Sequence, residues 1–177
     1  YLLGVDFGGS ASKATLLGVN GSVAATSVKE YPTRYPRFGW AEQDPDDSYD
    51  ALVYNVRSIL RSGGVAPEDI VALALDGATH TSVLLDERDR PIRPAIYWTD
   101  RRSKKQAEML SQQYSETLLQ LTLNMPSPLW TLPQLMWLRD NEPENFSRIR
   151  KVLFMKDYVR YRLTGDFVTD YIEAMGS

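Results

Sequence analysis

The first residues that could do chemistry together lie close to the start of the chain. A short apolar run ends at Asp6, and the adjacent glycines Gly8 and Gly9 follow it. Two successive glycines let the backbone turn tightly and present its N–H groups outward. Ser10 adds a hydroxyl and Lys13 adds a positive charge, so the segment could hold a polyphosphate. The carboxylate of Asp6 could hold Mg²⁺, directly or through water.

An ordinary hairpin turn with a surface lysine is the alternative interpretation of this segment, because short glycine-rich matches are common. Strands are expected on either side of it, at Tyr1–Asp6, Ser12–Val19 and Ser22–Tyr31. The pair Asn20-Gly21 between the last two is a strong hairpin signal. The chain is therefore predicted to open on a three-strand antiparallel meander. Its glycine turn differs from the phosphate loop that joins a strand to a helix.

Later segments predict a mixture of helices and strands. A helix is expected from Asp46 to Gly63, where apolar residues recur at helical spacing. Ile70–Leu75 is a continuous apolar run, which is typical of a buried strand. The other expected elements are strands at 81–85, 94–98 and 151–154, helices at 100–113, 131–139 and 156–163, and a loop at 32–45. This order predicts a mixed α/β domain and excludes a plain dinucleotide-binding start.

The composition excludes several classes of function. The 177 residues include 20 Lys and Arg against 23 Asp and Glu, a net charge of −3, which argues against nucleic acid or an anionic membrane as the main partner. The chain has no cysteine, which excludes disulfides, thiolate catalysis and cysteine metal sites and fits a cytoplasmic location. No apolar run approaches the ~20 residues of a membrane span.

Five segments together resemble a known family. Asp6–Ser10 resembles the first phosphate motif of the superfamily that contains sugar kinases, heat-shock ATPases and actin. Gly39–Pro45 is similar to the G-W-x-E-Q-D-P segment of the FGGY carbohydrate kinases. Pro94–Arg102, Thr131–Arg139 and Lys156–Asp170 are similar to three further segments of that family. Each match alone is short, but all five occur in the order of the family and spread over the whole chain.

The resemblance implies a fold and an activity. The fold would be a ribonuclease-H-like α/β lobe of the actin and sugar-kinase superfamily, flanked by helices. The activity would be transfer of the γ-phosphoryl group of ATP, with Mg²⁺, to a hydroxyl of a ketopentose such as D-xylulose, since the xylulokinase branch is the most similar. Residues 1–177 would form most of the N-terminal, sugar-binding lobe. The nucleotide lobe and the aspartate that acts as general base would lie beyond Ser177, so these residues alone would lack kinase activity.

The resemblance also implies a role for each candidate residue. Asp6 is the acid associated with Mg²⁺. The backbone of Gly8, Gly9 and Ser10, together with Lys13, faces the phosphate groups. The sugar side is expected to consist of Thr79, His80, Trp98, Asp100 and Arg101.

Simpler interpretations exist for some of these side chains. A lone histidine such as His80 is more often a packed or surface residue, although a neutral imidazole suits a polyol because it donates from one nitrogen and accepts at the other. Trp98 could equally pack in the core, and Asp100 could cap a helix.

Four departures from the family concern the sites themselves. Ala78, Thr79 and Thr81 stand where the substrate segment of the most similar branch has Gln, Met and Gly, and these changes would reshape the sugar pocket. Gly9 stands where the phosphate motif usually has Thr.

Other functions stay open at this stage. A ribonuclease-H-like nuclease could use Asp6 and Asp76 as a two-metal site. A non-catalytic sugar-binding relative would keep the fold without turnover, and a kinase could act on ribulose, glycerol or a sugar acid instead. The basic residues Arg101, Arg102, Lys104 and Lys105 are expected to form a solvated helix face and not a nucleic-acid site. The partner is expected to be a small-molecule sugar, with no nucleic acid and no membrane, and a homodimer is left open.

Overall fold

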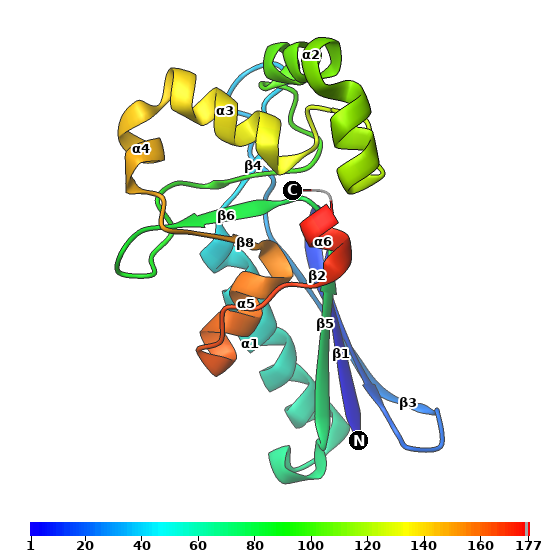
Figure 1. The fold of residues 1–177 in the computed structure, drawn as a ribbon. Coiled ribbons are helices and arrows are strands. Elements are labelled where there is room, and N and C mark those ends of the chain that lie inside the picture. The colour runs from blue at the N-terminus through cyan, green and yellow to red at the C-terminus, as the bar shows by residue number, and fades with distance from the viewer. Residues whose placement is uncertain (176) are drawn as a thin grey trace.

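The computed structural model describes residues 1–175 and 177, and Figure 1 shows two sheets with their helices. The first sheet has the strand order β3-β2-β1-β5. Strands β1 and β2 and strands β2 and β3 pair antiparallel, while β1 and β5 pair parallel. These strands are β1 Leu2–Phe7, β2 Ala11–Leu17, β3 Val23–Glu30 and β5 Ala72–Gly77. The predicted opening meander and mixed sheet are confirmed.

One long helix covers the first sheet. Alternate residues of β1, including Leu3 and Val5, are buried, as expected of a strand with one face on the core. They pack with Leu52 and Ile59 of α1, which spans Pro45–Gly63. The Asp44 side chain caps this helix by accepting a hydrogen bond from a backbone N–H in its first turn. The helix predicted from residue 46 is therefore confirmed.

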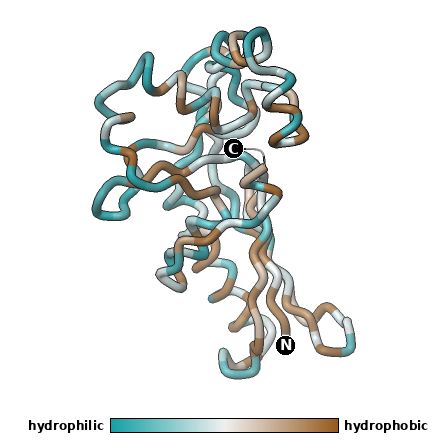
Figure 2. Tube along the Cα trace, in the orientation of Figure 1, coloured by the Kyte–Doolittle hydropathy of each residue, from teal (hydrophilic) through white to brown (hydrophobic). Residues whose placement is uncertain are grey.

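The expectation that residues 70–75 form a buried strand is wrong in one respect. The segment is a strand, but Ala72, Leu73 and Ala74 are exposed. Strand β5 is an edge strand: β1 pairs with one side of it, and no strand among residues 1–175 and 177 pairs with the other. A continuous apolar run is typical of a strand covered on both faces, and the described residues do not supply that cover. The first four residues of the strand are apolar, and the brown colour in Figure 2 follows this part of it.

The second sheet has the strand order β4-β7-β6-β8 and is antiparallel throughout. Its strands are β4 Glu42–Gln43, β7 Ala95–Ile96, β6 Ser82–Leu85 and β8 Lys151–Phe154. Strands β6, β7 and β8 were expected. The short β4 lies inside the predicted loop at 32–45, where the sequence gives no period-2 pattern long enough to reveal it.

The remaining helices lie beside the second sheet or, like the helix that follows β8, also pack against α1 and β5 (Figure 1). They are α2 Lys104–Thr122, α3 Thr131–Asn141, α4 Pro143–Arg148, α5 Met155–Thr164 and α6 Tyr171–Met175. Helix α2 begins later and ends later than predicted, and α4 and α6 were not predicted. Helix α5 ends as expected at Gly165, which has a left-handed φ of 80°. None of the described helices has both the length and the apolar composition that a bilayer span requires.

Candidate functional site

The turn Gly8–Ser10 is held through its carbonyl oxygens. The first carbonyl accepts a hydrogen bond from the Tyr31 hydroxyl at 2.7 Å, and the third accepts one from the Tyr31 backbone N–H at 3.0 Å. The middle carbonyl accepts from Gln43 Nε2 at 3.1 Å and from the Thr33 hydroxyl. All three carbonyl oxygens therefore point toward the protein, and they fix the orientation of the peptide groups between them.

Two of the three N–H groups of the same turn, in contrast, have no hydrogen-bond partner among the described residues. The Gly8 N–H closes the turn by donating to the Ala11 carbonyl at 3.0 Å. Neither the Gly9 nor the Ser10 N–H donates to any acceptor in the part of the chain that the structure describes. Successive backbone N–H groups left free in a fixed turn form an anion-binding concavity. Lys13 is exposed on β2, the strand that follows the turn.

Two carboxylates lie side by side at the end of β1. Asp6 is in register with Asp76 on the parallel strand β5 and with Lys13 on the antiparallel strand β2. Both carboxylates are exposed. Partial burial raises the pKa of Asp6, repulsion from Asp76 raises it further, and Lys13 lowers it. A divalent cation at this position would relieve the repulsion.

The donor set at this position fits Mg²⁺. In proteins this ion is commonly held by one or two carboxylates together with substrate phosphates and water. Asp6 and Asp76 supply two carboxylates, and the adjacent N–H groups suit the phosphates. No cluster of three or more His, Cys, Asp or Glu residues suitable for a metal ion occurs within residues 1–175 and 177. The described residues therefore lack the larger acid cluster that the nuclease hypothesis needs.

The turn after β5 carries Thr79 and His80 next to these acids. Its backbone is tied to β1, because the Ala78 N–H donates to the Phe7 carbonyl at 2.9 Å. Thr79 is exposed, and His80 has a left-handed φ of 55°, which is unusual for a residue other than glycine. The structure thus brings Thr79 and His80 to the same end of the first sheet as Asp6.

Glu173 and Trp130 hold His80 in this conformation. The His80 backbone N–H donates to Glu173 Oε2 at 3.0 Å, and Nδ1 of the imidazole lies 3.7 Å from the same oxygen. The ring packs edge-on against Trp130, with centroids 4.3 Å apart. Burial lowers the pKa of His80 and therefore favours the neutral imidazole at pH 7. The sequence analysis missed both partners, because each is distant in sequence and neither belongs to a local pattern.

The buried Glu173 carboxylate is itself part of a charged cluster. Burial raises its pKa, and the hydrogen bond from the His80 N–H lowers it. Lys156 Nζ lies 3.6 Å from Glu173 Oε1, 2.7 Å from Asp170 Oδ2 and 3.2 Å from Asp157 Oδ1. Lys156 and Asp170 both belong to the resemblance segment near the end of the chain. Through Glu173, that segment therefore helps to fix the backbone of the His80 turn.

Trp98 and Arg101 line a surface groove of 880 Å³ together with residues 38–40 and 126–129. Trp98 is 40% exposed, so the interpretation of this residue as core packing is wrong. The Arg101 N–H donates to the Gly39 carbonyl at 2.8 Å, which fixes the rim of the groove. Trp130 directly follows the segment 126–129, so one loop lines the groove and also packs on His80.

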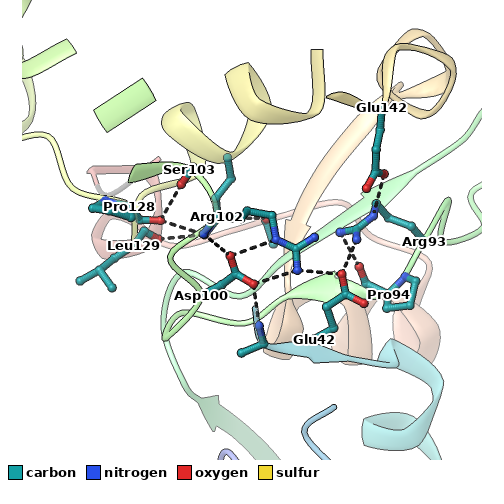
Figure 3. Close-up of polar contacts among 12 residues, drawn as sticks. Glu42, Arg93, Pro94, Asp100, Arg102, Ser103, Pro128, Leu129 and Glu142 are labelled. Atoms are coloured by element: carbon teal, nitrogen blue, oxygen red, sulfur yellow. Dashed lines mark hydrogen bonds and ion pairs between the residues drawn. The ribbon is translucent and has the colours of Figure 1, made fainter. Parts of the chain in front are cut away.

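Asp100 is the one expected sugar contact that the structure moves elsewhere. Its side chain is 1% exposed. Figure 3 shows both of its oxygens occupied: Oδ1 accepts from the backbone N–H and Nε of Arg102, and Oδ2 accepts from the Ala41 N–H at 2.6 Å and from Arg102 at 2.8 Å. No lone pair is left for a sugar, and Asp100 does not cap a helix either, because Ser103 is the residue that precedes α2.

The same network corrects the expected solvated basic face. The Arg102 side chain is fully buried and also pairs with Glu42 at 2.7 Å. Glu42 in turn pairs with Arg93, and Arg93 pairs with Glu142 at 3.0 Å (Figure 3). Arg101, Lys104 and Lys105 are exposed as expected. The network joins the loop after β7 to β4 and α4, and it holds the backbone between Trp98 and Arg101 in place.

The whole chain matches known carbohydrate kinases. Residues 1–177 match the N-terminal domain of the FGGY family of carbohydrate kinases. The chain is 34% identical over 177 residues to the xylulose kinase of Bacillus subtilis (strain 168), covering 100% of this chain and 36% of that protein. It is 30% identical over 178 residues to the glycerol kinase of Thermococcus onnurineus (strain NA1), covering 98% of this chain and 36% of that protein.

Solved structures show the same likeness. The ligand-bound xylulose kinase from Lactobacillus acidophilus superimposes with a TM-score of 0.93 at 28% identity, covering 99% of this chain and 36% of that one. This likeness confirms the α/β lobe of the actin and sugar-kinase superfamily that the resemblance implied. The chain spans 36% of the length of each of these relatives.

Proposed function

Because the chain belongs to the FGGY family of carbohydrate kinases, we propose that the whole protein transfers the γ-phosphoryl group of ATP to a hydroxyl of a small sugar. The preferred substrate in this proposal is a ketopentose such as D-xylulose, since three relatives that are 34% or 35% identical to this chain are xylulose kinases. A glycerol kinase matches at 30% identity, so a polyol is the second candidate.

The arrangement at the end of β1 carries the proposal. The backbone N–H groups of Gly9 and Ser10, which have no acceptor among the described residues, lie at the same end of the sheet as the carboxylates of Asp6 and Asp76. Phosphoryl transfer demands positioning and neutralisation of charge more than covalent participation of the protein. The fixed N–H donors and Lys13 suit the phosphate oxygens, and the two carboxylates suit a cation that the phosphates share.

Mg²⁺ is proposed to lie between the phosphates and the two carboxylates. When bound, it would neutralise charge that develops on the phosphate oxygens. Asp6 and Asp76 would hold it directly or through water, since Mg²⁺ usually keeps several waters. Asp6 is exposed, and its carboxylate forms no ion pair within the described residues, so its oxygens are available.

The sugar is proposed to lie between the His80 turn and the groove at Trp98. The neutral imidazole of His80 can exchange hydrogen bonds with a hydroxyl, and Trp98 offers an exposed apolar face to the carbon chain. Thr79 and Arg101 supply further polar groups at the rim. Asp100 is not proposed as a contact; its role is to hold the backbone that carries Trp98.

The remaining parts of the reaction are proposed to lie outside these residues. Residues 1–177 would be most of the sugar-binding lobe, and the aspartate that accepts the hydroxyl proton and the nucleotide lobe would belong to the rest of the protein. A cytoplasmic location is also proposed, because a chain without cysteine fits a reducing compartment. We further predict that the protein can form a homodimer.

A substrate panel with the full-length protein tests the proposal. D-xylulose, D-ribulose, glycerol and gluconate are incubated with ATP and Mg²⁺, ADP release is followed by a coupled assay, and the product is checked for the mass of one added phosphate. Turnover is expected with a ketopentose and loss of turnover with EDTA. Sugar binding without ADP release would support the non-catalytic relative instead, and turnover with glycerol alone would move the substrate to a polyol.

A further inference from the structure

Tyr97, which directly follows strand β7 of the second sheet, occupies the space that a side chain at Gly9 would need. A Cβ built on Gly9 would lie 2.5 Å from Tyr97 Oη and 3.2 Å from Tyr97 Cζ. A real Cβ essentially never lies as close as 2.5 Å to another heavy atom, so the Tyr97 hydroxyl would have to move. Gly9 does not have a positive φ, so its backbone conformation would accept other residues. The Tyr97 hydroxyl is therefore what excludes a side chain at position 9.

The hydroxyl of Tyr97 is available as a hydrogen-bond donor. The hydroxyl of Tyr31, which also lies at this turn, is used internally, because it donates to the Gly8 carbonyl at 2.7 Å. The Tyr97 hydroxyl donates to no acceptor among residues 1–175 and 177. The neighbouring Trp98 indole can only donate, so it leaves that proton free. Burial raises the pKa of Tyr97, and the hydroxyl stays protonated at neutral pH.

Tyr97 is also fixed in position. Its residue is 7% exposed, its N–H donates to the Ala41 carbonyl at 2.9 Å, and its carbonyl accepts from the Asp100 N–H at 2.8 Å. Asp100 and Ala41 are joined by their own hydrogen bond at 2.6 Å. The buried network of Figure 3 thus sets the place of the Tyr97 ring against the turn. A donor held in this way loses little conformational entropy when a ligand binds.

We propose that the Tyr97 hydroxyl is a third donor of the phosphate site, beside the Gly9 and Ser10 N–H groups. Its oxygen lies in the space that a hydroxyl side chain at residue 9 would occupy, although Tyr97 belongs to the segment after β7. The inference rests on the proposed function, because it takes the ligand of the turn to be the phosphate groups of ATP. It also supplies a hydroxyl to a turn in which Gly9 has no side chain of its own.

Substitution of Tyr97 by Phe in the full-length protein is the first test. Kinase activity of the unchanged protein is established beforehand, so that failure of the proposed function is recognised separately. The loss of one hydrogen bond to a charged group corresponds to roughly a tenfold to hundredfold change. Y97F is expected to raise the KM for ATP by that factor and to change the KM for the sugar less than twofold. Y114F, at an exposed tyrosine of α2, is the matched control and should change neither.

A paired exchange tests the spatial relationship. G9S in the unchanged background is expected to lower kcat/KM for ATP at least tenfold, because the new Cβ collides with Tyr97. G9S in the Y97L background is expected to raise kcat/KM for ATP above that of Y97L alone, because the serine hydroxyl then has room and replaces the lost donor. Such a change of sign is a coupling that independent sites do not show.

The outcomes separate a phosphate donor from a structural tyrosine. The proposal is overturned if Y97F leaves the KM for ATP unchanged, if it raises only the KM for the sugar, or if G9S is equally harmful in both backgrounds. Thermal melting of each variant establishes that it is folded. If Y97L does not fold, the comparison of Y97F with Y114F decides alone, since Y97F keeps the ring that packs on Gly9.

Discussion

Asp6 and Asp76 lie opposite each other in register on the parallel strands β1 and β5, and both carboxylates are exposed at the end of the sheet where the turn Gly8–Ser10 begins. Two like charges on adjacent strands destabilise the free protein unless a cation lies between them. The cation site proposed at this pair therefore yields predictions about activity and about stability that point in opposite directions.

Replacement of Asp6 by Asn is expected to lower the turnover of the full-length kinase by on the order of a hundredfold or more, because a group that stabilises developing charge is lost. The same variant should show a weaker dependence of rate on Mg²⁺ concentration. Initial rates over a Mg²⁺ titration measure both effects. D50N, an exposed carboxylate of α1, is the control. Unchanged turnover in D6N would remove Asp6 from the site.

The same variant is expected to stabilise the protein in the absence of metal. Burial and repulsion from Asp76 raise the pKa of Asp6 above its ordinary value of 3.8. A group with a raised pKa contributes its full stability below the ordinary value, and that contribution is lost as pH rises through the raised value. D6N should therefore melt higher than the unchanged protein at pH 7 without Mg²⁺, and the difference should shrink toward pH 4. Equal melting temperatures of the two proteins at pH 7 would contradict the claim that Asp6 and Asp76 repel each other in the metal-free protein.

Local signals allowed this end of the sheet to be predicted in part. An acid, two glycines and a following strand predict a tight hairpin, and the structure has one. The pairing of Asp6 with Asp76 could be named only as one hypothesis, because register across 70 residues is decided by the packing of the whole sheet. The free N–H groups of the turn could not be predicted at all. They depend on Tyr31, Thr33 and Gln43, whose hydrogen bonds to the turn are tertiary.

Residues that act through burial were the ones the sequence misassigned. Asp100 stands in a motif and begins a polar stretch, which favoured a sugar contact or a helix cap. Besides Arg102, its partner is Ala41, which is 59 residues away, and Glu173 is 93 residues from His80. Strand β5 was expected to be buried because its residues are apolar, yet its cover is not within the described residues. The type of a residue indicates which interactions it can form, while contacts with residues distant in sequence determine which of these interactions it does form.

Glu173 is expected to support the sugar site through the His80 turn. E173A removes the acceptor of the His80 N–H and leaves Lys156 with one carboxylate fewer. A buried donor without a partner costs about 1–3 kcal/mol of the free energy of unfolding, and a looser turn should raise the KM for the sugar without changing the KM for ATP. Denaturant unfolding and initial rates measure the two effects. E116A, on the exposed side of α2, should leave both unchanged.

E173Q separates the hydrogen bond from the charge. Gln keeps an acceptor for the His80 N–H but removes the attraction to Lys156. Its KM for the sugar should lie closer to that of the unchanged protein than the value for E173A. If E173Q and E173A are equally impaired, the charge on Glu173 matters more than the hydrogen bond, and the role in holding the turn is contradicted.

Trp98 and Asp100 are two residues apart, and they should respond to substitution in different ways. D100A leaves Arg102 buried without its main partner, and breaking a buried pair of this kind costs about 3–5 kcal/mol of the free energy of unfolding. W98A removes a half-exposed face at the groove and should leave the unfolding free energy within about 1 kcal/mol. The lost apolar contact, about 1–2 kcal/mol, should raise the KM for the sugar by roughly tenfold. Thermal melts together with sugar kinetics distinguish the two cases. An unchanged KM for the sugar in W98A would place the sugar away from the groove. Normal stability of D100A would show that the network of Figure 3 does not hold this backbone.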